Sequence, residues 1–355
     1  MTIFDLGWTP FFEAAFSTHD TDVFTPARIF RQDRQRYLAV SEIGTFNATL
    51  LGRLLHDESA VLPAVGDWVV LQAFDADQAV IHETLPRFSE FARKEVGQKT
   101  RRQVVAANIN TVFLVSGLDN DFNIRRIERY LVQAAGSGAK PVILLNKMDM
   151  CADLAGCISE VQRVAGDYPI IPLSAIEGDG IDQLKAHIKP GETVAFLGSS
   201  GVGKSSLVNR LVGDAYLKTG AVREDDSRGR HTTSHRELVL LDAGGLVMDT
   251  PGMRELQLWG EEEDLQAVFS DIEELAQNCK FRDCLHDTEP GCSVQEALET
   301  GTLDADRFAS YAKLKKELAY LDRRKDEASI MKARKKDKEL GKLYKSVQKN
   351  NPKRF

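Results

Sequence analysis

A glycine-rich segment at residues 198–205 has the residue types and spacing that hold a phosphate group. It reads Gly-Ser-Ser-Gly-Val-Gly-Lys-Ser, follows an apolar run and opens a helix-forming run, 204–212. Backbone N–H groups of such a loop point at phosphate oxygens, and the helix amino terminus adds a favourable dipole. We expect Lys204 to reach the β- and γ-phosphates and Ser205 to bind Mg²⁺ through its hydroxyl. The predicted phosphate-binding residues are Gly198, Ser199, Ser200, Gly201, Val202, Gly203, Lys204, Ser205 and Ser206.

Two later segments extend this site toward the third phosphate. Asp249-Thr-Pro-Gly252 ends another apolar run, where the carboxylate is placed to hold Mg²⁺ directly or through water. The Gly252 N–H can approach the γ-phosphate, and the glycine is a joint that can move. The stretch 229–233, Gly-Arg-His-Thr-Thr, lies between the two motifs in a charged segment and is expected to offer a threonine to Mg²⁺. Its spacing does not choose between Thr232 and Thr233.

The base-recognition residues are expected in two segments that come earlier in the chain. In Asn146-Lys-Met-Asp149, the aspartate can accept hydrogen bonds from guanine N1–H and the N2 amine, a donor pair that adenine lacks. Asn146 would tie neighbouring loops together and contact the base, and the Lys147 stem would cover its face. Leu173-Ser-Ala175 would supply a backbone donor to guanine O6. The predicted guanine-side residues are Asn146, Lys147, Met148, Asp149, Ser174 and Ala175.

The position that would orient the attacking water has an unusual occupant. Many GTPases carry a glutamine just after Asp-x-x-Gly, but Met253 stands there and cannot polarise water. We therefore expect the free protein to hydrolyse its bound guanine nucleotide slowly. Our hypothesis for the catalytic residues is that His231 accepts a hydrogen bond from the water, beside Lys204, Thr232 and Thr233. The alternative is that His231 only supports its loop and that bound RNA supplies the ordering.

A second kind of chemistry is expected near the C-terminus. Cys279, Cys284, His286 and Cys292 follow the spacing C-x4-C-x-H-x5-C. Three thiolates and one imidazole suit a closed tetrahedral Zn²⁺ site, one per chain and structural because no ligand position stays open. The alternative is cysteines without metal. Cys151 and Cys157 lie far away in the sequence and are expected to be ordinary thiols.

Hydrophobic patterning predicts a multidomain chain. Short strand-like runs indicate an OB-type barrel of five strands after a short N-terminal helix, at 27–30, 36–43, 45–55, 67–74 and 78–85. A basic linker, 93–102, leads to alternating strands and helices, which predict an α/β domain with a mainly parallel sheet. The stretch 261–278 is expected to be helical. The expected domains are 1–104 with helix, barrel and linker, 105–260 with the nucleotide motifs, and 261–355 with the zinc site and a basic tail.

Composition limits the class of protein. The chain has 355 residues, 43% apolar and 28% charged, which is ordinary for a globular protein and excludes bulk disorder. No apolar run approaches the ~18 residues of a membrane span, and the first residues lack a basic secretory region, so we expect a cytoplasmic protein. The net charge of −7 combines a tail from Lys313 at +10 with a body at −17. The tail is either a site for a polyanionic partner or a solvated helix.

The order of these motifs resembles the ribosome small-subunit-dependent GTPase A family over roughly residues 25–320. In ordinary small GTPases the guanine motifs follow the phosphate loop, whereas here they precede it, as in a circularly permuted GTPase. The resemblance implies hydrolysis of GTP to GDP and phosphate, slow alone and stimulated by the small ribosomal subunit, late in maturation of that subunit. It also implies a barrel that binds ribosomal RNA and a zinc domain that contacts the subunit.

The sequence is compatible with two other classes of function. One is a small-molecule enzyme such as a kinase, for which the sequence offers no acceptor motif. The other is an RNA-binding zinc protein with a regulatory or vestigial nucleotide site, against which the intact Lys204, Ser205, Asp249 and Asp149 argue. We expect the protein to be a monomer that binds neither membrane nor DNA.

Overall fold

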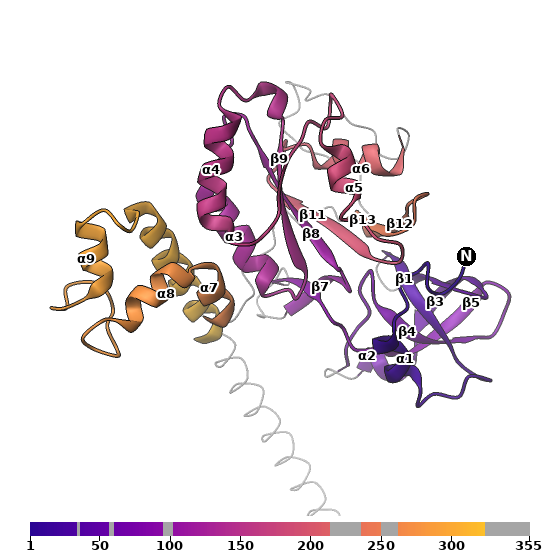
Figure 1. The fold of residues 1–355 in the computed structure, drawn as a ribbon. Helices are drawn as coiled ribbons and strands as arrows, with labels where there is room; N and C mark the ends of the chain where they lie inside the picture. Colours follow the sequence, from indigo (N-terminus) through magenta and orange to yellow (C-terminus); the bar gives the residue numbers. More distant parts are fainter. Residues whose placement is uncertain (34–35, 57–59, 95–101, 214–235, 250–261, 324–355) are drawn as a thin grey trace, which may run out of the picture.

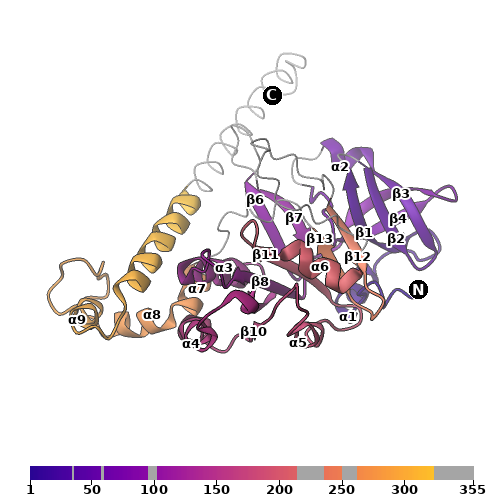
Figure 2. The same cartoon turned by 90° about the horizontal axis from the view of Figure 1, so that it is seen from above.

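The computed structural model describes residues 1–33, 36–56, 60–94, 102–213, 236–249 and 262–323. A central α/β domain lies between an N-terminal barrel and a group of C-terminal helices, which occupy opposite sides in both views (Figures 1 and 2). None of the helices in these ranges is long and apolar enough to cross a lipid bilayer.

Five strands close the N-terminal barrel. They run in the order β1-β2-β3-β5-β4, and β4 pairs back with β1. Alternate residues of these strands point inward and form a separate apolar core around Ile29, Phe46 and Leu71. The predicted five-strand barrel is thus confirmed, with the strands β1 (Thr25–Asp33), β2 (Arg36–Ser41), β3 (Gly44–Leu50), β4 (Trp68–Ala73) and β5 (Gln78–Thr84).

Two details of the N-terminal part differ from the sequence expectation. The predicted strand 45–55 is too long, because pairing of β3 ends at Leu50 opposite Ile81 and helix α2 (Gly52–His56) follows. The ends of the predicted linker 93–102 are paired strands, β6 (Glu90–Lys94) and β7 (Arg102–Ala107). Periodicity did not reveal this hairpin because its strand ends are basic and not apolar.

The N-terminal helix α1 (Pro10–Phe16) packs on the outside of the barrel. Phe12 and Phe16 are buried beside Trp8 and Trp68, whereas Phe11 is exposed. This aromatic cluster fastens the first residues of the chain to the barrel.

The central sheet is mainly parallel, as the sequence predicts. Its parallel strands lie in the order β10-β9-β8-β11-β13, and β12 (Arg236–Leu240) joins β13 in the antiparallel direction. β12 also pairs with β1 of the barrel, so barrel and central sheet are hydrogen-bonded to each other. The parallel strands are β8 (Thr111–Gly117), β9 (Lys140–Asn146), β10 (Ile170–Pro172), β11 (Thr193–Gly198) and β13 (Leu246–Asp249).

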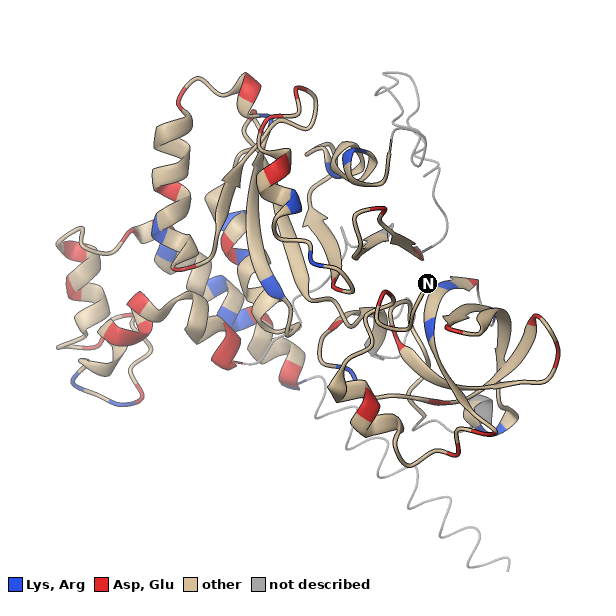
Figure 3. Ribbon diagram, turned by 45° about the vertical axis from the view of Figure 1, so that its right-hand side comes forward, with Lys and Arg blue, Asp and Glu red and all other residues tan. Residues whose placement is uncertain are grey.

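Helices cover both faces of this sheet. α3 (Ile124–Ala135) and α4 (Leu154–Ala165) lie on one face, and α5 (Ile181–Lys185) and α6 (Lys204–Val212) on the other. Adjacent strand residues serve opposite cores, as with Leu114 and Val115 of β8. Burial on both faces explains why these strands read as continuous apolar runs. Figure 3 shows the central strands almost free of charged residues, which lie on the surrounding helices and loops.

The C-terminal helices pack against α3. The predicted helical stretch 261–278 contains two helices, α7 (Glu262–Val268) and α8 (Ser270–Gln277). They separate at Phe269, whose backbone leaves the helical region to place its ring in the core beside Tyr311. Helix α9 (Ser293–Glu299) and a helix over residues 305–323 complete this part.

Candidate nucleotide site and metal centre

The phosphate loop joins β11 to α6 at the carboxyl edge of the sheet. Gly203 adopts φ +98°, and a Cβ atom there would lie 2.2 Å from the Asn146 amide nitrogen. Only glycine fits this conformation and this close approach. The Lys204 ammonium lies over the loop, where it donates to the carbonyls of Gly198, at 2.6 Å, and Ser199. Ser205 is exposed at the start of α6, as a metal-binding hydroxyl requires.

Asn146 connects three loops of the site. Its buried side chain donates to the Val202 carbonyl at 2.7 Å and accepts from the Ala175 N–H at 3.0 Å. These contacts join the end of β9 to the phosphate loop and to the segment after β10. The loop-tying role expected for Asn146 is therefore present in the geometry.

The segment after β10 is held by its own hydrogen bonds. The Ser174 N–H donates to the Asp179 carbonyl, and the Ser174 hydroxyl accepts from the Glu177 N–H at 3.1 Å. The Ala175 N–H of this segment, which is expected to supply a backbone donor to guanine O6, donates to Asn146 Oδ1. Ser174 and Ala175 are thus set beside the Asn146-to-Asp149 motif.

Lys147 and Asp149 lie at the outer side of this motif. Lys147 adopts φ +66° before the short 3-10 helix η1 (Met148–Met150), which presents Asp149 to solvent. The Lys147 ammonium donates to Asp119 Oδ2 at 2.5 Å, and this hydrogen bond holds the pKa of the Asp119 carboxyl below its usual value. Sequence reasoning missed Asp119. Its place just after β8, next to the strand that carries Asn146, was the available signal.

Several predicted residues lie outside the described part of the chain. They are His231, Thr232, Thr233, Gly252 and Met253. Asp249 is the last residue of β13, and its side chain is outside the description. Because β13 is the parallel neighbour of β11, the backbone of Asp249 reaches the same edge of the sheet as the phosphate loop.

The Cys/His residues form a compact cluster. The ligand atoms of Cys279, Cys284, His286 and Cys292 all lie within 4.8 Å of one another. Sγ of Cys279 is 3.8 Å from Sγ of Cys292 and 3.6 Å from Nδ1 of His286. Zn–S bonds of about 2.3 Å and Zn–N bonds of about 2.0–2.1 Å give tetrahedral edges of about 3.5–3.8 Å. Cys279, His286 and Cys292 thus lie at the spacing of a tetrahedral site, and Cys284 Sγ, within 4.8 Å of them, can supply the fourth ligand.

The backbone around the cluster fixes the ligand positions. Cys292 caps α9, because its sulfur accepts from the Gln295 N–H, and Gln295 in turn donates to the His286 carbonyl at 2.5 Å. His286 adopts φ +60°, which turns its ring toward the thiols. Cys151 and Cys157 lie apart from this centre, half-buried, with their sulfurs 3.8 Å from each other.

The sheet order and these sites define a class of protein. The phosphate-loop strand β11 is central, and the strands that carry the guanine motifs, β9 and β10, lie in the same sheet but precede it in the chain. The molecule is a circularly permuted P-loop GTPase with a barrel and a cluster of three cysteines and one histidine that could hold a metal ion.

The chain belongs to the RsgA GTPase family, whose family model matches residues 84–259. The small ribosomal subunit biogenesis GTPase RsgA of Opitutus terrae is 49% identical, over 92% of this chain and 92% of that protein. The crystal structure of YjeQ from Thermotoga maritima superposes with a TM-score of 0.63 at 28% identity, covering 84% of this chain and 99% of that one. YloQ, described as a circularly permuted GTPase, gives a TM-score of 0.59 at 28% identity, over 85% and 97% of the two chains.

Proposed function

We propose that this GTPase is a late maturation factor of the small ribosomal subunit, slow alone and stimulated by that subunit. The names of its relatives support the choice of partner. The observation that carries the nucleotide part is Asn146, which joins the guanine motif, the phosphate loop and the Ala175 segment through one buried side chain. A vestigial site would have no need of this arrangement.

The proposed nucleotide residues divide by role. Asp149, Asn146 and Lys147 would select and cover guanine, and residues 198–206 would hold the phosphates. Bound Mg²⁺ would neutralise phosphate charge, held by Ser205, by Thr232 or Thr233, and by Asp249. Lys204 would support the β- and γ-phosphates. His231 would orient the attacking water, with RNA-induced ordering of its loop as the alternative.

The other parts would serve assembly. We propose Zn²⁺, one per chain, as the ion held by Cys279, Cys284, His286 and Cys292. The barrel within 1–104 would contact ribosomal RNA, 105–260 would act on GTP, and 261–355 would contact the subunit through the zinc centre and the basic tail. We propose that the protein acts as a monomer in the cytoplasm, with GTP, GDP and ribosomal RNA as its ligands.

A turnover assay tests the function. Phosphate release from GTP is measured for the protein alone, with small subunits and with large subunits as the matched control. We expect small subunits, and not large subunits, to increase the rate of phosphate release. The increase should not exceed about 10⁵-fold, since a partner that completes a GTPase site raises the rate about 10³–10⁵-fold. Equal rates in all three samples would contradict the proposal and favour a static RNA-binding protein.

Guanine selection has a separate test. Asp149→Asn should lower the affinity for GTP and raise the affinity for xanthosine triphosphate, because the asparagine amide can donate to the extra carbonyl of xanthine. Equal affinity of the unchanged protein for ATP and GTP would remove the guanine assignment.

A further inference from the structure

Arg126 makes a contact with the phosphate loop that no GTPase sequence motif accounts for. It lies in the first turn of α3, which Asn123 caps by accepting from the Arg126 N–H at 3.0 Å. Nη1 of Arg126 donates to the Ser199 hydroxyl at 2.7 Å. Ser199 is the first residue of the loop after β11. We propose that Arg126 is a positioning residue for GTP hydrolysis, acting through Ser199.

The phosphate loop is held from outside at two points. Asn146 holds its second half through the Val202 carbonyl, at 2.7 Å. Arg126 holds its first half through Ser199, whose carbonyl also receives the Lys204 ammonium. Ordered loop dipoles stabilise a transition state because they need no rearrangement as charge develops. Arg126 therefore keeps the first half of the phosphate loop in position.

Arg126 also closes a chain of polar contacts between the two sides of the site. Its Nη1 contacts Asp121 Oδ2 at 2.5 Å, and the Asp121 N–H donates to Asp119 Oδ1 at 3.0 Å. Asp119 in turn pairs with Lys147 of the guanine motif. The loop between β8 and α3 thus links the guanine side to the phosphate side, and Arg126 is its last member.

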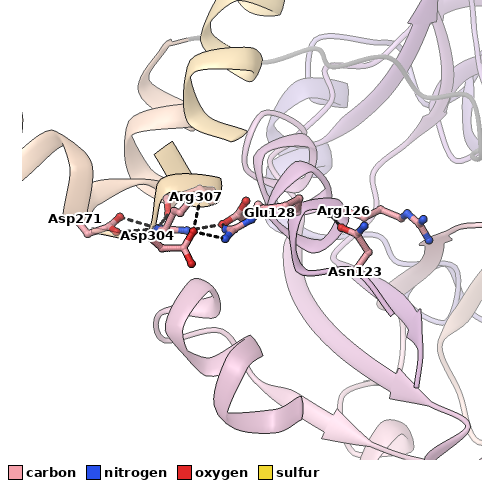
Figure 4. A network of polar contacts seen from close by, with 8 residues as sticks. Asn123, Arg126, Glu128, Asp271, Asp304 and Arg307 are labelled. Atoms are coloured by element: carbon pink, nitrogen blue, oxygen red, sulfur yellow. Dashed lines mark hydrogen bonds and ion pairs between the residues drawn. The ribbon is translucent and has the colours of Figure 1, made fainter. Parts of the chain in front are cut away.

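The helix that carries Arg126 is fixed on its opposite side. Glu128 is fully buried, and its Oε1 accepts from Arg125 at 2.6 Å and from Arg307 at 2.8 Å. Arg307 also forms a two-point pair with Asp271. Figure 4 shows Arg126 pointing away from this cluster, which lies between α3 and the C-terminal helices. Because the cluster prevents α3 from shifting, the guanidinium stays at the loop.

The guanidinium has further donors at this place. About a third of the Arg126 side chain is exposed, and within the described ranges all its side-chain hydrogen bonds run through Nη1. Asp121 Oδ2 lies 2.5 Å from Nη1 and offsets part of the positive charge, so Arg126 acts on the loop through its hydrogen bond to Ser199.

A double-mutant cycle tests the inference on the full-length protein. Arg126→Ala and Ser199→Ala should each lower kcat for GTP hydrolysis about tenfold, with KM and GDP affinity changed less than about threefold. The double variant should be no slower than either single variant, because both changes remove one contact. Arg163→Ala is the matched control: it removes an exposed arginine from the last turn of α4, on the same face of the sheet, and should leave kcat unchanged.

The outcomes separate this inference from the proposed function, on which it rests for the role of the loop. If the unchanged protein fails to hydrolyse GTP, the proposed function fails. If it hydrolyses GTP but the two effects multiply in the double variant, Arg126 does not act through Ser199. A parallel fall of kcat, GDP affinity and melting temperature in both single variants would make the contact merely structural. Unchanged kcat in Arg126→Ala would also overturn the inference.

Discussion

The barrel and the C-terminal helices join the central domain through contacts of different chemistry. At the barrel junction, β1 pairs with β12 through its backbone, with Arg31 opposite Glu237 and Gln32 opposite Arg236. At the helical junction, α3 shares an apolar core with the C-terminal helices and adds ion pairs, Arg307 with Glu128 and Arg129 with Glu317 among them.

One buried cation completes the barrel junction. Arg28 is 2% exposed and donates to the carbonyls of Leu6 at 2.5 Å, Gly66 at 3.2 Å and Asn108 at 3.1 Å, and to the Thr193 hydroxyl at 2.7 Å. Burial lowers the pKa of Arg28 to about 9, so the guanidinium stays charged at neutral pH. Neutral dipoles from four parts of the chain surround it, and none of these contacts is a carboxylate.

Both junctions are connected to the nucleotide site, but through different elements of the central domain. The barrel junction uses β12, which follows the segment that contains Thr232 and Thr233, and Thr193, the first residue of β11. The helical junction uses α3, which carries Arg126 to Ser199. Salt weakens exposed ion pairs but leaves buried backbone hydrogen bonds largely unaffected. Because Arg129 and Glu317 are about 30% exposed, we expect added salt to weaken this pair, whereas the buried pair of Arg307 with Glu128 should respond little.

Removal of the metal should have the largest effect, because it should destabilise the C-terminal helices and leave the barrel junction intact. Cys279→Ser leaves only three ligands, and structural zinc sites contribute about 10–16 kcal/mol of apparent binding energy to folding. We expect loss of metal by elemental analysis and loss of amide-exchange protection in α8 and α9. Amides of β1 and β12 should stay protected. The control is Cys157→Ser, and a variant at Cys279 that retains its metal would contradict the assignment.

Arg28→Met should come next. The change removes the donor of four buried acceptors, of which the Gly66 carbonyl keeps the Asn108 amide as a partner. Each unsatisfied buried group costs about 1–3 kcal/mol, so we expect about 4 kcal/mol of destabilisation. Urea unfolding measures it. Arg31→Met on the same strand is the control, since its pair with Asp33 is about 40% exposed and should contribute less than about 1 kcal/mol. Equal effects of the two changes would refute the role of Arg28.

Arg307→Met should cost somewhat less, about 3 kcal/mol, because buried Glu128 keeps Arg125 as a partner. Adding Glu128→Gln should recover part of the loss, since it removes a buried charge that has kept only one of its two cationic partners. Urea unfolding with both single variants and the double variant measures this coupling. Strict additivity would show that the two residues do not stabilise each other.

The smallest effect concerns acidity. The hydrogen bond from Arg129 holds the pKa of the Glu317 carboxyl below its usual 4.5. The stabilisation is therefore complete above about pH 4.5 and is lost as pH falls through the lowered pKa. Since both side chains are about 30% exposed, we expect less than about 1 kcal/mol. Thermal melting of Glu317→Gln should lack this part of the pH dependence, and an unchanged profile would exclude the pair as its source.

Local patterns determined much of this molecule. The strand, loop and helix around Gly198–Lys204 need only adjacent residues, and the same is true of the spacing from Cys279 to Cys292. Alternating and continuous apolar runs indicated the barrel and the parallel sheet because burial on one face or two sets the hydropathy period. The break at Phe269 was not predicted because the ring packs on Tyr311, a partner distant in sequence, and the hairpin of β6 and β7 was missed because its strand ends are basic.

Tertiary structure alone decided how these pieces act together. Pairing of Arg31 with Glu237, burial of Arg28 among Leu6, Asn108 and Thr193, and the approach of Arg126 to Ser199 join residues that are far apart in the chain. No period or spacing encodes such contacts, because a charged residue reads the same in a sequence whether it faces water or a buried carbonyl. Packing of the barrel and of α3 against the central sheet selects which of these charges become buried and thereby binds the domains to the nucleotide site.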